Sequence, residues 1–219
     1  MSAQATSTAL SGESEFGGRA GQTRRKLVDA GTFLFSQHGY EATSTRQIET
    51  YAGVQRNLMS YHFGSKEEFW KACVSRLFEH MVSALRPATV QSRDIEPVER
   101  IRFLIRQFIR ASAATPEINR IMFDEGRCND WRLEWIVEHY VRDFFGSVTE
   151  LFEEGRRHHV IPDLSPIQFY YLLVGSASIF SMAPECRLLS GRDPNEDAMV
   201  NAQADAIAAL LTSARASDS

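Results

Sequence analysis

The segment GVQRNLMSYHFGSKEEF, residues 53–69, gathers side chains that can bind a polyanion. Arg can bridge the acceptors of guanine, Asn or Gln can bridge adenine, and Leu can contact the methyl group of thymine. The free N–H groups at the start of a helix can hold phosphates, as can Lys, His and Tyr side chains beside it. The residue types of this segment therefore favour contact with double-stranded DNA.

The candidate DNA-binding residues fall into two groups. We expect one group to face base edges at the start of a short helix: Gln55, Arg56, Asn57, Leu58 and Ser60. We expect the other group to surround that helix and contact phosphates: Thr45, Arg46, Tyr61, His62 and Lys66. Plainer interpretations exist, because Arg56 and Lys66 could be ordinary solvated charges and His62 could pack between two helices.

Helical periodicity and capping residues predict the elements that position these side chains. A first helix is expected from Thr23, a plausible N-cap, to Gly39, and a second from Thr43 or Ser44 to Gly53. A third is expected over 55–61, and a fourth over 65–85 with Ser65 as its cap. Val54 and Met59 should face a small core with Phe35, Ile48 and Ala52. Two short helices joined through Gly53, which can adopt a positive φ, match the helix-turn-helix pattern.

The run TRRKLVDAGTFLFSQHGYEATSTRQIETYAGVQRNLMSYHFGSKEEF resembles the N-terminal DNA-binding domain of TetR/AcrR family transcriptional regulators over about positions 23–70. The resemblance implies an all-helical homodimer that binds a palindromic operator, with a ligand pocket and the dimer interface in its C-terminal domains. It also implies DNA contacts at Arg46, Gln55, Arg56, Asn57, Leu58, Tyr61, His62 and Lys66. Asn57 stands where the family commonly has Gly, Leu58 where Thr is common, and Ser60 where Tyr is frequent.

The rest of the chain is also helical in its apolar period, and no strand pattern occurs. Helices are expected at 95–114, 116–125, 130–159, 165–188 and 194–214, after a loop marked by Pro87 and Pro97. We therefore predict an all-α fold with a disordered tail (1–22), a three-helix helix-turn-helix domain (23–70) and a larger ligand-binding and dimerisation domain (71–219).

Charge and cysteine content narrow the class of protein. The chain has a net charge of −4, yet residues 1–66 hold seven Lys or Arg against five Asp or Glu, so the excess of acid lies beyond Lys66. Three widely spaced cysteines match neither a disulfide framework nor a zinc site. No apolar run approaches the roughly 20 residues of a membrane span, and no basic region precedes an apolar stretch at the N-terminus. We expect a cytoplasmic protein without a membrane partner.

The C-terminal half offers residues for an unknown small-molecule effector and for dimerisation. The candidate pocket residues are apolar, aromatic or, in one case, imidazole side chains: Phe103, Phe108, Met122, Phe123, Trp135, His139, Phe144, Tyr171 and Phe180. Aromatic residues at helical spacing can equally be plain core. The segments FYYLLVGSASIFSM and DAMVNAQADAIAALL could pack closely against a second copy, as the last two long helices do in the resembling family, or only within the chain.

The sequence leaves three possible functions for this protein. A ligand-released repressor would lose its operator when a ligand shifts the fourth helix and changes the spacing of two recognition helices. An architectural DNA binder would have a filled C-terminal core and no effector. An all-α metal enzyme would need more than Glu154 with His158 and His159, and the Gly-rich phosphate loop, G-x-S-x-G and His-Glu-x-x-His motifs do not occur. We therefore expect no enzyme, no cofactor and no bound metal.

Overall fold

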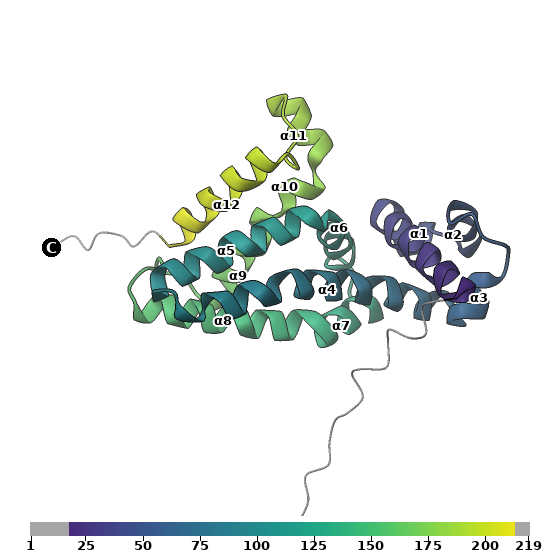
Figure 1. Ribbon diagram of the computed structural model, residues 1–219, viewed down its shortest axis with the longest axis horizontal. Helices are drawn as coiled ribbons and strands as arrows, with labels where there is room; N and C mark the ends of the chain where they lie inside the picture. The colour runs from purple at the N-terminus through teal and green to yellow at the C-terminus, as the bar shows by residue number, and fades with distance from the viewer. Residues whose placement is uncertain (1–17, 213–219) are drawn as a thin grey trace, which may run out of the picture. The chain divides into compact units, whose positions relative to one another are not determined.

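The computed structural model describes residues 18–212. Every regular element in that range is helical, so the all-α prediction is confirmed. Most of the predicted N-terminal tail, residues 1–17, lies outside the described residues. The chain divides into two compact units, one up to Arg76 and one from Leu77 onward. Figure 1 labels their helices along the chain.

The first unit contains the predicted helix-turn-helix. Its helices are α1 (Arg19–Ala42), α2 (Thr45–Tyr51), α3 (Leu58–Phe63) and the first turns of α4 (Lys66–Gln91). Helix α1 begins about one turn earlier than expected, because Thr23 donates its hydroxyl to Arg19 O at 3.0 Å instead of capping the helix. Its helical geometry breaks at Gly39, where the sequence predicts the end of the helix and φ is 76°, and a further short helical stretch leads to Ala42.

The core of the first unit joins α1 to α2, α3 and α4. Its most deeply buried side chains are Leu27, Phe35, Ile48, Met59, Phe69 and Trp70. Gly31 allows α1 and α4 to approach closely, since a Cβ at this position would lie 2.4 Å from Phe69 Cζ and 2.8 Å from Cys73 Sγ. Phe35, Ile48 and Met59, which the apolar pattern assigns to this core, are all buried, whereas Ala52 and Val54 are only half-buried.

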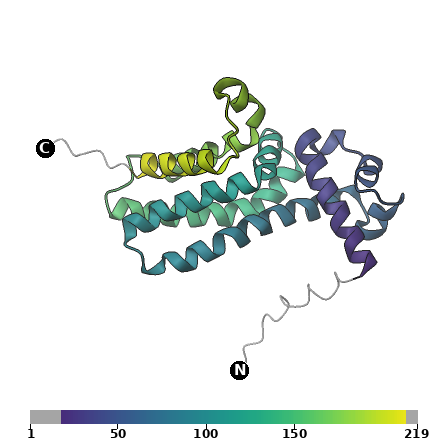
Figure 2. The same ribbon diagram turned by 45° about the horizontal axis from the view of Figure 1, so that its top comes forward.

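The second unit is a helical bundle built around α5. It contains the C-terminal turns of α4 and the elements η1 (Ser92–Asp94), α5 (Pro97–Ala114), α6 (Pro116–Glu125), α7 (Trp131–Ile136), η2 (Val137–Val141), α8 (Arg142–Arg157), α9 (Pro166–Ser176), α10 (Ser178–Ser181), α11 (Ala183–Ser190) and α12 (Asp197–Leu211). Helix α12 packs along α5 (Figure 2), with Ala204 and Ala208 fully buried. Ion pairing of Arg106 with Asp205, at 2.7 Å, adds to this contact.

Helix α4 continues through Pro87, where the sequence predicts a loop. Proline cannot donate a backbone hydrogen bond, and in a helix interior it usually ends or kinks the helix. Here Leu85 packs against the core of the second unit and Ala88 is 5% exposed. Burial of these neighbours stabilises the helix on both sides of the proline, which composition alone could not reveal.

The helix expected over 165–188 is broken into α9, α10 and α11. Side chains from other helices donate hydrogen bonds to backbone carbonyl groups at these breaks. Asn119 of α6 donates to Ala177 O at 3.2 Å, and Gln203 of α12 donates to Ser176 O at 2.9 Å. Pro184 then starts α11. The breaks are therefore stabilised by tertiary hydrogen bonds.

Two further boundaries differ from the sequence prediction. The helix expected over 130–159 is present as α7, η2 and α8, where η2 is a five-residue π-helical segment between the two α-helical parts. The last helix begins at Asp197 and not near Pro194, because Asp193 accepts the Asn195 amide at 3.0 Å in a turn that precedes it.

Within residues 18–212, no individual helix combines the length and apolar character of a membrane span; only the bent pair Pro166–Ser181 and Ala183–Ser190, angled at 77°, passes that test by length and composition.

Candidate nucleic-acid interface

The turn between α2 and α3 is a complete Schellman motif. Gly53 adopts φ 64°, its N–H bonds to Thr50 O at 3.2 Å, and Val54 N–H bonds to Glu49 O at 3.1 Å. These bonds satisfy the last carbonyl groups of α2, and a residue without a side chain takes the left-handed conformation most easily. The predicted role of Gly53 is confirmed, since the chain reverses at this residue.

Helix α3 begins later than expected. Gln55 and Arg56 lie in the turn, and the helix starts at Leu58 with Asn57 as its N-cap. Asn57 has φ 68° and makes no side-chain capping bond. The left-handed conformation is costly for most residues, whereas Gly and Asn adopt it. This geometry gives a physical reason for Asn at a position where the resembling family commonly has Gly.

A buried carboxylate joins α2 to α3. Glu49 is 6% exposed, and its Oε1 accepts a hydrogen bond from Met59 N–H at 3.0 Å. The bond gives a partner to one of the first N–H groups of α3, which no residue within that helix can satisfy. Sequence reasoning missed Glu49. A charged residue between the inward positions Ile48 and Ala52 was the available signal.

The base-facing candidates lie on the solvent side of this turn and helix. Gln55, Arg56, Asn57 and Ser60 are exposed, while Met59 between them is buried. Leu58 is half-buried, so only part of its side chain is available to a partner. The structure thus brings the five residues together at the start of α3.

The phosphate candidates differ from one another in their surroundings. Arg46 on α2 and Tyr61 on α3 are exposed, Tyr61 to 80%. Thr45 and His62 are half-buried, and the His62 ring packs edge-on against Tyr61 with centroids 5.1 Å apart. Lys66 is half-buried, with Nζ 4.1 Å from the centroid of the Tyr40 ring. His62 and Lys66 therefore pack against aromatic rings as well as being candidates for phosphate contact.

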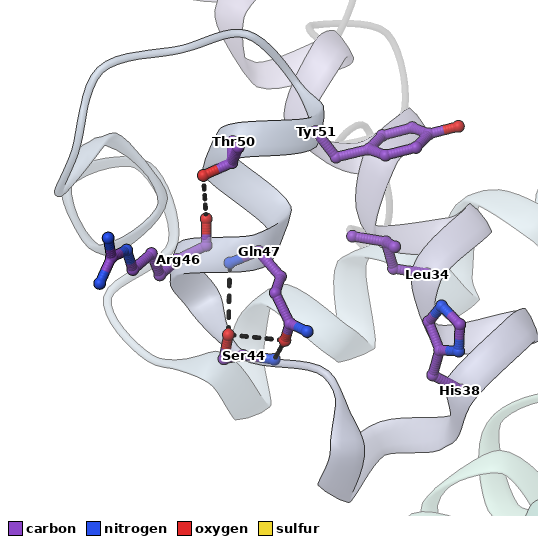
Figure 3. Close-up of a pocket in the computed structure, with 7 residues that line it drawn as sticks. All are labelled: Leu34, His38, Ser44, Arg46, Gln47, Thr50 and Tyr51. Carbon is purple, nitrogen blue, oxygen red and sulfur yellow. Dashed lines mark hydrogen bonds between the residues drawn. The ribbon is translucent and has the colours of Figure 1, made fainter.

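The N-terminus of α2 is fixed by a capping box. Gln47 N–H donates to Ser44 Oγ at 3.3 Å, and Ser44 N–H donates to Gln47 Oε1 at 2.8 Å. Figure 3 shows these bonds beside a shallow hollow of about 350 Å³ between α1 and α2. The hollow is lined by Leu34, His38, Ser44, Arg46, Gln47, Thr50 and Tyr51. Arg46 is exposed, and its guanidinium points away from Leu34 and His38 (Figure 3).

The effector candidates of the second unit are divided between core and surface. Phe108 and Phe180 are buried, and Phe108 stacks on Phe144 with centroids 5.4 Å apart. Trp135 stacks on His139 at 4.6 Å, and Phe103 and Met122 are half-buried. Phe123 and Tyr171 are 54% and 65% exposed. Phe108, Phe144 and Phe180 share one hydrophobic core, whereas Phe123 and Tyr171 face solvent.

The second unit contains a buried hydroxyl group without a protein partner and an ion pair that involves a candidate metal-binding carboxylate. Ser112 on α5 is 2% exposed, and its hydroxyl makes no hydrogen bond to another protein atom. Glu154 forms an ion pair with Arg100 at 3.1 Å, which ties its carboxylate to α5. Among residues 18–212, no three His, Cys, Asp or Glu side chains are grouped as metal ligands would be.

Comparison with known proteins agrees with the geometry of the first unit. Residues 27–73 match the family model described as "Bacterial regulatory proteins, tetR family". The HTH-type transcriptional repressor KstR of Mycolicibacterium smegmatis is 29% identical over 118 residues, which are 53% of this chain and 57% of that protein. The HTH-type transcriptional regulator RutR of Escherichia coli is 29% identical over 98 residues, 45% of each chain. This chain thus spans about half the length of these curated relatives.

Solved structures share the fold over most of the chain. The hemolysin II transcriptional regulator HlyIIR has a TM-score of 0.64 at 21% identity and covers 88% of this chain and 98% of its own. FadR from Bacillus subtilis, solved in complex with stearoyl-CoA, has a TM-score of 0.62 at 15% identity and covers 87% of this chain and 98% of its own. Both of these curated relatives are named as transcriptional regulators. Residues 27–73 thus match the DNA-binding domain model of the TetR family of bacterial regulatory proteins, and the chain as a whole shares the fold of these solved regulators.

Proposed function

We propose that the chain is a homodimeric transcriptional repressor that binds a palindromic operator and releases it when a small, largely apolar ligand binds. The observation that carries this proposal is the asymmetry of α3, whose Met59 is buried while Arg56, Asn57 and Ser60 around its start are exposed. Polar side chains at the start of a helix can reach base edges in the major groove. The architectural binder remains the alternative that the ligand experiment below distinguishes.

The phosphate contacts of this proposal come from α2, α3 and α4. Arg46 and Tyr61 present exposed side chains, and Lys66 brings a positive charge near the start of α4. Such contacts supply most of the affinity for DNA of any sequence, whereas base contacts supply the preference. Arg46 and Lys66 are therefore assigned to affinity, and Arg56 and Asn57 to sequence preference.

The ligand is assigned to the second unit. Phe108, Phe144 and Phe180 provide an aromatic core, and Ser112 provides a buried hydroxyl without a protein partner. A buried polar group that lacks a hydrogen bond is costly, so a ligand able to pair with Ser112 would gain from doing so. Stearoyl-CoA, the ligand in the FadR complex, is the first probe for this site.

Dimerisation is assigned to the solvent faces of α9 and α12. Tyr171, Leu172 and Gly175 are exposed on α9, and Ala202 and Ala206 are exposed on α12. Small residues allow helices to approach closely, and two copies related by a twofold axis would bury the same surface twice.

In this proposal, the ligand causes release of the operator through α4, which contributes residues to both units. Its residues up to Arg76 belong to the first unit, and those from Leu77 to Gln91 belong to the second. Two recognition helices fit successive major grooves only when they lie about 34 Å apart. A ligand that binds one position of α4 more tightly than another would change this separation and weaken operator binding.

The test is selection of bound sequences from random duplex DNA by the full chain, followed by titration at one stated salt concentration. We expect a palindrome, and we expect Arg56→Ala to lose about 1–3 kcal/mol of preference at one base position. Arg93→Ala, which removes an exposed Arg of the second unit, is the matched control and should bind like the wild type. If no sequence is enriched, the proposal that the chain recognises a specific operator is wrong.

The ligand is tested on the operator so obtained. Saturation with stearoyl-CoA should lower operator affinity while leaving the affinity of a Ser112→Ala variant less changed. If stearoyl-CoA and a panel of fatty acids and aromatic acids all leave operator affinity unchanged, the architectural binder becomes the better description of the chain.

A further inference from the structure

We propose that Glu49 is the positioning residue of the recognition helix: its buried carboxylate holds the start of α3 in one orientation against α2, and this orientation sets the base preference. The inference rests on the proposed function, because it concerns how α3 reads DNA. It assigns to Glu49 a role that requires no contact with DNA, since the side chain is 6% exposed.

The geometry ties three parts of the motif to this one residue. The Glu49 backbone carbonyl accepts Val54 N–H at 3.1 Å and so closes the turn after α2. Its side-chain Oε1 accepts Met59 N–H at 3.0 Å and so holds the first turn of α3. Ile48, the neighbour of Glu49, is fully buried and anchors α2 in the core. The two ends of the connection between the helices therefore meet at Glu49.

Apart from the burial of the Met59 side chain, helix α3 has few other means of fixing its N-terminus. It spans six residues, and its N-cap Asn57 makes no side-chain capping bond. In most helices a Ser, Thr, Asp or Asn at the N-cap accepts one of the first N–H groups. Here the acceptor comes from the preceding helix, and it carries a negative charge, which strengthens a bond to N–H groups at the positive end of a helix.

The opposite end of α3 is fixed by apolar and cation–π contacts. Phe63 packs edge-on against Phe69 with centroids 4.8 Å apart, and the Arg24 guanidinium lies 4.8 Å from the centroid of the Phe63 ring. With its C-terminal end held in this way, α3 can still change its tilt if its N-terminal end is released. The Glu49 bond removes that freedom at the end where Gln55, Arg56 and Asn57 lie.

Three substitutions separate the bond from other properties of the side chain. Glu49→Gln keeps the length and an acceptor oxygen but removes the charge. Glu49→Asp keeps the charge but is shorter by one methylene group, so it cannot reach Met59 N–H without movement of α3. Glu49→Ala removes the acceptor. Val28→Ala, in the buried face of α1, is the control for a general loss of stability.

The readout is the ratio of affinities for the selected operator and for a duplex of unrelated sequence, measured at one salt concentration and well below each variant's unfolding temperature. We expect this ratio to fall about tenfold in Glu49→Ala and Glu49→Asp, as loss of one buried hydrogen bond would allow. Glu49→Gln should stay within about threefold of the wild type, and Val28→Ala should keep the wild-type ratio. Hydrogen exchange at the Met59 amide should become faster only in the Ala and Asp variants.

A purely structural role for Glu49 gives a different result. Glu49→Ala and Glu49→Asp would then lower the unfolding temperature, as Val28→Ala does, but the folded protein would keep the wild-type ratio, and the inference would be wrong. Equal losses in Glu49→Gln and Glu49→Ala would also overturn it, because the amide oxygen can accept the same bond. If Glu49→Ala does not fold, Glu49→Asp against Glu49→Gln decides. Absence of any operator for the wild type would instead reject the proposed function.

Discussion

The ammonium nitrogen of Lys66 lies 4.1 Å from the centroid of the Tyr40 ring, at the start of α4. The Tyr40 ring in turn packs edge-on against Trp70, with centroids 6.1 Å apart, and Trp70 is fully buried. A cation over an aromatic face is attracted by the ring, so Tyr40 orients the charge that the sequence assigns to phosphate binding.

Lys66→Met is expected to weaken binding to operator and to unrelated DNA by the same factor. Loss of one phosphate contact should also reduce the slope of log affinity against log salt concentration by about 1. Titrations at several salt concentrations measure both quantities. An unchanged slope would mean that Lys66 makes no contact with a phosphate.

At position 57, we expect a substitution by Gly to preserve the stability of the protein and a substitution by Ala to reduce it. Its φ is 68°, in the left-handed region, which costs most residues with a Cβ about 1–2 kcal/mol but which Asn adopts more readily than Ala. Asn57→Ala should therefore lower the free energy of unfolding. Asn57→Gly should change the free energy of unfolding by less than about 1 kcal/mol, since Gly adopts this conformation readily. Denaturant unfolding of both variants measures the difference. Equal stability of the Ala and Gly variants would contradict the left-handed conformation of this residue.

Gly31 and Gly146 should respond to Ala in opposite directions. A Cβ at Gly31 would lie 2.4 Å from Phe69 Cζ, and such overpacking typically costs about 1–3 kcal/mol. A Cβ at Gly146 on α8 meets no atom within 4 Å, so Gly146→Ala should stabilise the helix by about 0.5–1 kcal/mol. Denaturant unfolding compares the two. Stabilisation by Gly31→Ala would contradict the close approach of α1 and α4.

The proposed dimer interface on α9 and α12 predicts the effect of a charge on the exposed face of α12. Ala206→Arg should convert a dimer into a monomer, because it places an unpaired charge where two small surfaces should meet. Ala114→Arg, at the exposed end of α5, should leave the dimer intact. Light scattering after gel filtration measures the mass. A monomeric wild type, or a dimeric Ala206→Arg, would place the interface elsewhere or remove it.

Local signals in the sequence predict the parts of the site that depend on neighbouring residues. Ser65 was expected to cap α4, and its Oγ accepts Glu68 N–H at 3.1 Å. The conformation of Gly53 and the burial of Met59 likewise follow from turn chemistry and apolar spacing. All three depend on residues only a few positions away.

Tertiary hydrogen bonds account for what the sequence could not predict. The Glu49 carboxylate bonds to an amide ten residues further along the chain, and Asn119 bonds to a carbonyl 58 residues away. Neither partner lies within one helical turn, so neither periodicity nor capping rules indicate the contact. The contact that holds the start of α3 and the contact at the break after α9 are therefore visible only in the structure.

A buried ion pair between α6 and α7 predicts a dependence of stability on pH. Glu125 and Arg132 are 4% and 8% exposed, with Arg132 Nε 2.7 Å from Glu125 Oε2. Arg132 also contacts Asp130 Oδ2 at 2.7 Å. Burial raises the pKa of the Glu125 carboxyl above its ordinary value, and the hydrogen bond from Arg132 opposes that rise. The contribution of Glu125 to stability is therefore present below its pKa in the unfolded chain and is lost as pH rises through its pKa in the folded protein.

Arg132→Met should lower the free energy of unfolding by about 3–5 kcal/mol at neutral pH, because it leaves a buried carboxylate without its cation. The pKa of Glu125 should rise further in this variant, so the deficit relative to the wild type should shrink as the solution is acidified and the carboxyl takes up a proton. The double variant Glu125→Leu/Arg132→Met removes both charges and should lose much less stability at neutral pH. Denaturant unfolding at about pH 5 and about pH 8 compares the three proteins near and above the usual range of a glutamate carboxyl. An Arg132→Met deficit that is the same at both values would mean that Glu125 is not the group left unpaired, and Asp130 would be the next to replace.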